Sequence, residues 1–276
     1  MRRTRPLIAV VLVGGLTAAV ALTAGGVVLT RTGGGSGSDA AVTTTSTTAP
    51  PTTTTPSTTT TTEAPTTTTT APPPAGADGT LELGEAGDEV AVLQQRLGDL
   101  GFWLGTPDGT YGQLTRQAVM AFQKSAGLGR DGVAGPATLA ALDTAARPAP
   151  STPEGTHLEI DLGRQILLVV EGGQTKWVLN TSTGNGEAYA APGGGTAVAS
   201  TPRGSFSIYR QIDGLREAPL GTLYRPKYFT GGIAIHGSGS IPAYPASHGC
   251  ARLTNAAMDL LWSSGLAPVG TPVLVY

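Results

Sequence analysis

The distribution of apolar and polar residues divides the chain into five stretches of different character, and the first is residues 1–31. Three arginines lie among the first five residues, and an apolar run without a charge then extends over 7–29. A basic start followed by such a run is typical of an export signal whose N-terminus stays in the cytoplasm. The run is close to the roughly 20 apolar residues that span a bilayer. We therefore expect an uncleaved membrane anchor, with cleavage near the small residues 19–21 as the alternative.

The second stretch, residues 32–79, is rich in Gly and Ser at first and then in Thr and Pro, with almost no large apolar side chains. Because it cannot bury enough apolar surface to offset the entropy lost on ordering, we expect a disordered Thr/Pro-rich linker. In its most extended form, at about 3 Å per residue, such a linker reaches on the order of 100 Å from the membrane.

Helical periodicity appears in the third stretch, residues 80–146. Val90, Leu93 and Leu97 follow the spacing of one helix face. The same spacing recurs further on, so the predicted helices lie at 88–97, 114–123 and 137–142. Turn signals at 107–109 and 131–132 separate them. This pattern predicts a small all-α domain of about three helices.

A short Pro-containing linker at 147–155 leads into the last stretch, residues 156–276. Here β-branched and apolar runs alternate with Gly-rich turns. The predicted strands lie at 155–162, 165–170, 176–180, 205–209, 232–236 and 273–276. One amphipathic helix is expected at 255–262. The pattern therefore predicts a mainly β domain in this part of the chain.

Composition adds two limits to this picture. The 276 residues carry a net charge of −2, so no basic excess favours a nucleic-acid partner. The chain contains a single cysteine, Cys250. An unpaired thiol outside the cytoplasm is exposed to oxidation, so we expect it to be retained for its chemistry.

Cys250 lies in a loop-rich segment, residues 235–253, that also holds His236 and His248, two of the three histidines. A thiol attacks as the thiolate, so a catalytic cysteine needs an imidazole nearby to take its proton. The glycines and prolines of the segment indicate irregular backbone that can display functional groups. Gly249 suits a turn whose N–H groups point at a developing oxyanion.

Two other interpretations of these residues remain open at this point. A lone cysteine is often a small buried apolar residue without a chemical role. His236, His248 and Cys250 are also ligand types that zinc prefers. No HExxH-type helix accompanies them, which makes zinc the weaker hypothesis.

The segment carries a family resemblance. The run G-I-A-I-H-G at 232–237, followed by S-H-G-C-A-R at 247–252, resembles the signature of the L,D-transpeptidase (YkuD-like) catalytic domain. The T-P-R-G-S-F run at 201–206 and Y-F-T-G at 228–231 extend the resemblance, which covers nearly all of 156–276. Ala251 departs from the pattern, in which a larger aliphatic residue is common. The resemblance implies a mainly β sandwich with the cysteine loop at one end.

The resemblance also implies a role for each residue that matches the signature. Cys250 is then the acyl-enzyme nucleophile and His236 its base, with the carbonyl of Gly237 orienting the ring. His248 and Gly249 complete the catalytic group by shaping the turn around the thiol. The residues expected to contact the substrate are Arg252, Tyr228 and Ser247. No metal ion and no cofactor are expected.

A second resemblance lies in the helical part. The patterns L-Q-x-x-L and A-V-x-x-F-Q, with D-G-x-x-G-x-x-T at 108–115 and again at 131–138, resemble the peptidoglycan-binding domain found beside many wall enzymes. The two D-G segments are equally well explained as helix-entry turns with Asp and Thr as caps. The sequence therefore assigns no binding residues in this domain.

Together the resemblances imply an exported enzyme of cell-wall biogenesis. Cys250 would attack a carbonyl of a peptidoglycan stem peptide, release the terminal amino acid (a D-alanine by family likeness) and pass the acyl group to an amine of a neighbouring stem. Hydrolysis of the same acyl-enzyme, which is L,D-carboxypeptidase activity, and a non-catalytic wall-binding role are the alternatives. The expected partners are stem peptides, glycan and, through the N-terminal helix, the membrane. We expect a monomer on the extracytoplasmic face of the membrane.

Overall fold

The computed structural model describes residue 76 and residues 78–276 of the chain. The expected membrane anchor, at 1–31, and nearly all of the expected linker, at 32–79, lie outside the described residues. In the described part of the chain, no helix has both the length and the apolar character needed to cross a membrane.

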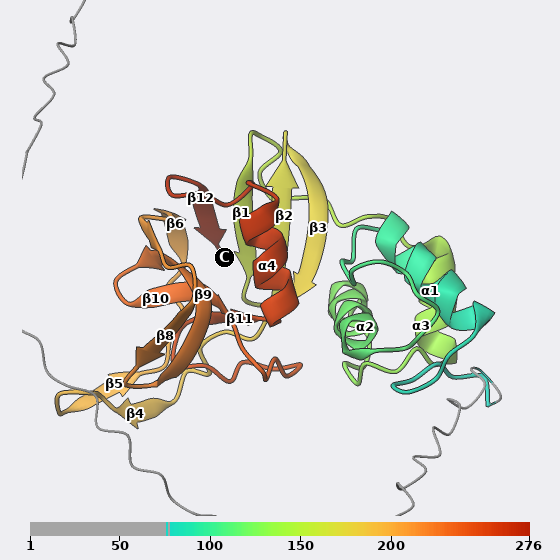
Figure 1. Cartoon of the computed structure of the whole chain (residues 1–276), viewed down its shortest axis with the longest axis horizontal. Coiled ribbons are helices and arrows are strands. Elements are labelled where there is room, and N and C mark those ends of the chain that lie inside the picture. The colour runs from blue at the N-terminus through green and yellow to red at the C-terminus, as the bar shows by residue number, and fades with distance from the viewer. Residues whose placement is uncertain (1–75, 77) are drawn as a thin grey trace, which may run out of the picture. The chain divides into compact units, whose positions relative to one another are not determined.

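The first described domain consists of three helices, as the sequence predicts (Figure 1). They are α1 (Asp88–Asp99), α2 (Gln113–Ala126) and α3 (Pro136–Thr144). Their apolar faces form one buried cluster that includes Val90, Leu97 and Phe122. Phe102 and Phe122 meet edge to face in it, with ring centroids 5.5 Å apart.

The two D-G-x-x-G-x-x-T segments are turns built around buried glutamines. The Gln94 side chain donates to Asp108 Oδ1, the Thr110 carbonyl and Thr115 Oγ1, each at 2.9 Å. Its Oε1 accepts from the amides of Asp108 and Gly109. The Gln94 side chain therefore supplies hydrogen-bond partners for the whole turn. The turn in turn satisfies the buried carboxamide, which would otherwise destabilise the core.

The second segment repeats this arrangement around Gln123. That side chain donates to Asp131 Oδ1 at 2.7 Å and to Thr138 Oγ1 at 3.2 Å. The residues that precede α2 and α3 are Gly112 and Gly135, and neither helix has a side-chain cap. The alternative of helix-entry turns is therefore wrong about the Asp and Thr caps, because these side chains bond to the buried glutamines and, for the two Asp, to amides of their own turns.

A five-stranded sheet follows, with strand order β3-β2-β1-β12-β6. Its strands are β1 (His157–Asp161), β2 (Ile166–Glu171), β3 (Gln174–Asn180), β6 (Gly204–Ser207) and β12 (Pro272–Val275). β1 pairs with β12 in parallel, and the other pairs are antiparallel.

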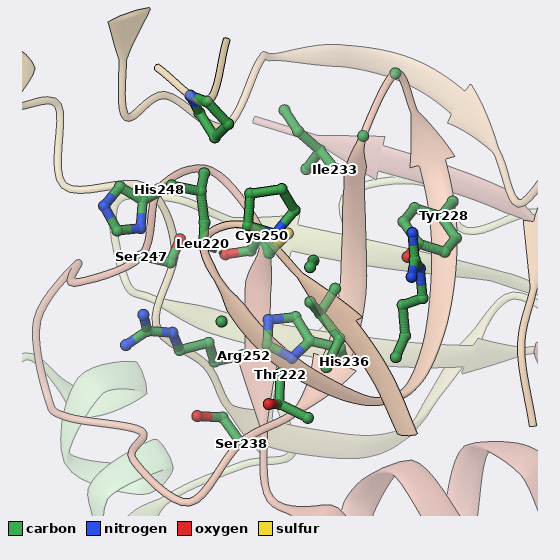
Figure 2. A pocket seen from close by; sticks show the side chains of 18 of the residues that line it. Leu220, Thr222, Tyr228, Ile233, His236, Ser238, Ser247, His248, Cys250 and Arg252 are labelled. Carbon is green, nitrogen blue, oxygen red and sulfur yellow. Dashed lines mark hydrogen bonds between the residues drawn. The ribbon is translucent and has the colours of Figure 1, made fainter. Parts of the chain in front are cut away.

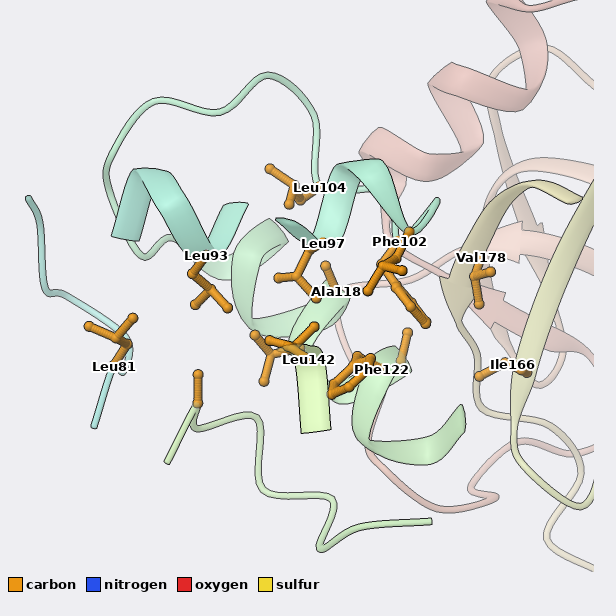
Figure 3. Close-up of a cluster of buried hydrophobic side chains, with 14 of the residues drawn as sticks. Leu81, Leu93, Leu97, Phe102, Leu104, Ala118, Phe122, Leu142, Ile166 and Val178 are labelled. Atoms are coloured by element: carbon orange, nitrogen blue, oxygen red, sulfur yellow. The ribbon is translucent and has the colours of Figure 1, made fainter. Parts of the chain in front are cut away.

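Both faces of β2 are buried, which explains its continuous apolar sequence. Ile166 and Leu168 belong to the same buried cluster as the helices, together with Val178 of β3 (Figure 3). Leu167 and Val169, which alternate with them, belong to the core on the other face of the sheet. Alternate residues of a strand point to opposite faces, so a strand covered on both sides has no polar face. Helix α2 and the residues packed with it therefore cover one face of this sheet.

Polar contacts add to this interface between helices and sheet. Trp103 and Gly101, after α1, exchange backbone hydrogen bonds with Val178, at 3.2 and 2.7 Å. Lys124 of α2 is 1% exposed, and its ammonium group donates to the carbonyls of Gln165 and Thr181 at 3.0 Å each. A third bond runs from Lys124 to the Asn180 side chain. The helical and β parts are thus one packed unit.

The second sheet has the order β11-β10-β9-β7, and β8 also pairs with β9. Its strands are β7 (Arg210–Gln211), β8 (Leu215–Ala218), β9 (Gly221–Thr230), β10 (Ile233–Gly237) and β11 (Ala251–Leu253). A hairpin of β4 (Ala188–Ala190) and β5 (Thr196–Val198) stands apart from both sheets.

The core between the two sheets joins Ile160 and Val273 of the first to Phe229 and Ile235 of the second. Helix α4 (Asn255–Ser263) contacts β9 and β10 and adds Met258 to this core. Unlike the first three helices, α4 has a side-chain cap, because Thr254 Oγ1 accepts from the Ala257 amide at 3.0 Å. A mainly β domain after a helical one is thus confirmed.

Candidate active site

Six of the eight residues singled out in the sequence line a cleft of about 620 Å³, whereas Gly237 and Gly249 do not line it. Figure 2 shows Cys250 near its centre, with His248 to one side, Tyr228 to the other, and His236 and Arg252 below. The hairpins β4–β5 and β8–β9 contribute residues to the same lining.

Parallel pairing of β10 with β11 brings the histidine and the thiol together. Ile235 pairs with Ala251, and His236 pairs with Arg252. Cys250 directly precedes β11, and its Sγ accepts a hydrogen bond from the Ala234 amide at 3.4 Å. Paired residues of neighbouring strands point to the same face of a sheet, and so do residues two apart along one strand. Residues far apart in the sequence therefore share one surface.

The imidazole of His236 is oriented by its own strand. Nδ1 lies 2.9 Å from the carbonyl oxygen of Gly237. A carbonyl only accepts, so Nδ1 carries the proton and Nε2 is left as the basic atom. A side chain at Gly237 would place its Cβ 2.5 Å from Asn255 Oδ1, which explains why the chain has glycine here.

Burial sets the protonation of both groups. His236 is 6% exposed, and this burial, assisted by the positive charge of Arg252, holds its pKa below the ordinary value. Burial also raises the pKa of the Cys250 thiol, although the Ala234 amide and Arg252 act in the opposite direction. Both shifts favour an uncharged thiol beside an uncharged imidazole.

The thiol and the imidazole are not hydrogen-bonded to each other anywhere in the described structure. They line the same cleft from adjacent strands. Catalytic hydrogen bonds are often long before the substrate binds and shorten only in the complex. The lack of a direct bond in the free protein therefore does not exclude the pair from acting together when a substrate is bound.

The turn before the cysteine is held by Ser247 and Thr201. The Ser247 hydroxyl donates to the Cys250 carbonyl at 2.6 Å and accepts from the Gly249 amide at 3.0 Å. The Thr201 hydroxyl donates to the Gly249 carbonyl at 2.6 Å. Ser247 is 3% exposed and its hydroxyl bonds within the turn, and the residue also lines the cleft, so its substrate contact stays a prediction. Thr201 lies in the T-P-R-G-S-F run, but no role was assigned to it there.

Gly249 has a structural reason to be glycine and does not offer its own N–H to a substrate. Its φ is +137°, and a Cβ would lie 2.9 Å from the Ser200 carbonyl oxygen. Its amide is used by Ser247. The amides of His248 and Cys250, by contrast, have no acceptor within the described chain. These two N–H groups are the ones available to an oxyanion.

Two aromatic contacts complete the walls of the cleft. The exposed ring of His248 meets Tyr189 of β4 edge-on, with centroids 4.7 Å apart. The guanidinium of Arg210 lies over the ring of Tyr228, 5.1 Å from its centroid. Neither Tyr189 nor Arg210 could be found from the sequence, because each lies in a short strand that carries no motif.

Metal binding was the alternative for these residues. Within residues 76 and 78–276, no three His, Cys, Asp or Glu side chains are grouped so that they could hold a metal ion. His236, His248 and Cys250 share a cleft without forming such a group.

A β domain whose cleft collects one thiol and two imidazoles is an enzyme domain by its chemistry. Two family models match the chain: a peptidoglycan binding domain at residues 86–142 and the L,D-transpeptidase catalytic domain at residues 155–275. Peptidoglycan-related domains side by side indicate a protein of the cell wall, outside the cytoplasm.

Solved and curated relatives agree with these matches. An L,D-transpeptidase from Xylanimonas cellulosilytica DSM 15894 is 56% identical, with a TM-score of 0.68, over 71% of this chain and 96% of that one. The chain therefore belongs to the L,D-transpeptidases, and the resemblance seen in the sequence is confirmed.

Two curated proteins share shorter regions with the chain. The N-acetylmuramoyl-L-alanine amidase CwlM of Mycobacterium tuberculosis is 52% identical over 56 residues, and the amidase CwlL of Bacillus licheniformis is 48% identical over 64. These regions cover 20% and 22% of this chain. The matched regions span only 14% and 18% of the two relatives.

Proposed function

We propose that the protein cross-links peptidoglycan stem peptides through a thioester on Cys250. The observation that carries this proposal is the pairing of β10 with β11, which brings His236 and Cys250 into one cleft with Nε2 as the free basic atom. A nucleophile and an oriented base on adjacent rigid strands are what covalent acyl transfer requires.

The first half of the reaction transfers an acyl group to sulfur. His236 Nε2 takes the thiol proton as Cys250 Sγ attacks a peptide carbonyl of the donor stem. The negative charge that develops on the carbonyl oxygen is stabilised by the free amides of His248 and Cys250. The tetrahedral intermediate then collapses: the carbon–nitrogen bond breaks, and the leaving amine takes the proton from His236. A thioester remains.

The second half resolves the thioester. An amine from a neighbouring stem attacks it, His236 accepts a proton from that amine, and the proton returns to the sulfur as the thiol leaves. A new amide bond, the cross-link, is formed. If water takes the place of the amine, the same intermediate gives a carboxylic acid, which is the carboxypeptidase outcome.

The other parts of the chain receive roles that fit this reaction. We assign peptidoglycan binding to the three-helix domain and membrane attachment to the apolar residues 7–29, so that the enzyme works on the outer face of the membrane as a monomer. Arg252 and Tyr228, which line the cleft, contact the donor stem.

Mass spectrometry of purified muropeptides incubated with the chain lacking residues 1–31 tests this proposal. Cross-linking gives a new species whose mass equals two stems less the released amino acid. Hydrolysis gives a shortened monomer without a dimer and would replace the transferase assignment. Unchanged muropeptides, in the presence of protein that a thermal melt shows to be folded, would contradict an enzymatic role on this substrate.

A further inference from the structure

The cleft around Cys250 is lined by charges of one sign. Its charged lining residues are Arg210, Arg216 and Arg252, and no aspartate or glutamate contributes to the lining. None of the three has a carboxylate within salt-bridge distance among the described residues. Unpaired positive charges in a concave site attract anions and raise their local concentration.

Another arginine of the same sheet is paired with carboxylates, in contrast to the arginines of the cleft. Arg225, on β9, bonds to Asp213 at 2.8 Å and to Asp259 at 2.7 Å. Its charge is thereby balanced within the protein. The arginines of the cleft lack such partners, so their charge is available to a ligand.

Arg210 is held in a defined position. It pairs with Tyr228 across β7 and β9, and its guanidinium lies over the ring of that tyrosine, 5.1 Å from the centroid. Tyr228 is 8% exposed and is flanked by Tyr209, with ring centroids 6.4 Å apart. The Tyr209 hydroxyl donates to the Gly231 carbonyl. An arginine stacked on a fixed ring keeps the N–H groups at its edge free for hydrogen bonds.

Arg216 approaches the cleft from the neighbouring strand. It pairs with Leu223 across β8 and β9, and its side chain is exposed. Arg252 belongs to a different part of the lining, because it lies in β11, two residues after Cys250. The cleft thus has one cation beside the thiol and two more on the strands β7 and β8 that flank β9.

We propose that Arg210, seated on Tyr228, forms with Arg216 a carboxylate-binding subsite that selects acidic peptides in the cleft. This proposal rests on the proposed function, since it concerns peptides presented to Cys250. The planar guanidinium matches a carboxylate with two parallel hydrogen bonds, whereas a carboxamide offers one acceptor and no charge. Arg252 serves the end of the peptide close to the attacked bond. Arg210 and Arg216 serve a carboxylate farther from it.

The test uses synthetic stem-type peptides in which each free carboxylate is replaced by a carboxamide, one at a time. Binding is measured calorimetrically to full-length protein carrying Cys250→Ala, so that no reaction occurs. One replacement, away from the attacked bond, is expected to weaken binding roughly three- to ten-fold, the range for partly exposed charged pairs. The difference should shrink in about 1 M salt, where the screening length is only about 3 Å.

Charge-removing variants identify the residues. In the same background, Arg210→Gln and Arg216→Gln are expected to bind the acid and that amide with nearly equal affinity, while affinity for the amide stays unchanged. Arg203→Gln is the matched control, since Arg203 is an exposed arginine of the same domain outside this cleft. Arg203→Gln should keep the full preference for the acid over the amide.

Equal binding of acid and amide by the parent protein would overturn the proposal. An unchanged preference in both arginine variants would do the same. Equal loss of affinity for both peptides in Arg210→Gln would mean that the residue only supports the fold of the cleft. These binding ratios do not depend on the nucleophile, so a failure of Cys250 chemistry appears separately, as absent turnover of both peptides by the wild-type protein.

Discussion

The Nδ1 atom of His236 lies 2.9 Å from the carbonyl oxygen of Gly237, the next residue of the same strand. A strand end that orients its own imidazole needs no carboxylate partner for that purpose. The ring is fixed by backbone geometry alone, with Nε2 left toward the cleft.

Replacement of His236 therefore tests the base directly. We expect His236→Ala to keep the melting temperature near that of the wild type but to lower muropeptide turnover roughly 10²- to 10⁴-fold, as for lost general-base catalysis. His157→Gln is the control, because His157 is a buried histidine whose Nε2 contacts Glu159 at 3.0 Å, on a strand of the other sheet. Normal turnover in His236→Ala would remove the base assignment.

The pH dependence of acylation follows from the two pKa shifts. Burial lowers the pKa of His236 from 6.5 and raises that of Cys250 from 9.0. The imidazole must be uncharged to accept the thiol proton, so the competent state is lost as the pH falls through the lowered pKa of His236. We expect the rate of acylation by a carbapenem to rise with pH below 6.5 and then to stay level to about pH 9.

Stopped-flow fluorescence against pH measures this profile, and peptide mapping locates the adduct on Cys250. The adduct should be absent from Cys250→Ala. A rate that climbs ten-fold per pH unit up to pH 9 would show that the free thiolate reacts without help from the imidazole. An adduct on another residue would contradict the nucleophile itself.

The buried ammonium of Lys124 is expected to stabilise the contact between α2 and the first sheet. Lys124→Met keeps an apolar side chain of similar length but leaves the carbonyls of Gln165 and Thr181 without this donor. We expect the free energy of unfolding in urea to fall by about 1–3 kcal/mol. Lys176→Met, at a surface lysine that pairs with Glu171 at 2.7 Å, should change it by less than about 1 kcal/mol. Equal effects would show that burial of the ammonium is irrelevant.

Removal of the helical domain tests the same interface on a larger scale. Deletion of residues 80–146 exposes Ile166, Leu168 and Val178 to water. We expect the remaining β domain to melt at a lower temperature, to aggregate and to lose turnover even on soluble muropeptides. Wild-type melting and turnover after the deletion would mean that the helices serve only to bind the polymer.

The buried glutamine Gln94 is expected to contribute to the stability of the three-helix domain. Gln94→Ala removes five hydrogen bonds at the first turn, to Asp108, Gly109, Thr110 and Thr115. The expected loss of unfolding free energy is about 1–3 kcal/mol, because buried polar groups are left unsatisfied. Gln95→Ala, an exposed neighbour that bonds only to Asp99, is expected to cost less than about 0.5 kcal/mol. A denaturant titration of both variants decides the point.

Local patterns were enough to predict the elements with regular apolar spacing. All three helices of the first domain, α4 and the strands β1, β2, β3, β6, β10 and β12 lie close to their predicted ranges. The strands β4, β5, β7, β8, β9 and β11 were missed. In β9, Pro226 and Lys227 argue against a buried strand, yet Lys227 is 1% exposed because its ammonium bonds to the Ala267 carbonyl at 2.9 Å and lies over Trp262. Such partners come from distant residues, which no local pattern contains.

The residues of the site also divide into those that a local signature identifies and those that depend on distant partners. Cys250 and His236 could be identified because each lies in a short signature. Tyr189 and Arg210 reach the cleft on the strands β4 and β7, and their own sequence surroundings do not distinguish them. Thr201 lies in the T-P-R-G-S-F run, but its bond to the Gly249 carbonyl depends on a residue far along the chain. The hydrogen bonds of Ser247 within the turn could not be predicted from its place in the signature, which indicates a substrate contact.

Helix α2 and the strand β3 share a core, and the buried Lys124 of α2 bonds to Asn180 of β3, so the three-helix domain is held against the first sheet. An active site that is held rigidly to its own polymer-binding domain reaches only those acceptors that lie at a fixed distance from the polymer chain bound by that domain. For an enzyme that acts on a polymer, this fixed distance determines where along the polymer it can react. Under the proposed function, the cross-links would then recur at a set spacing along the wall, which this interface determines.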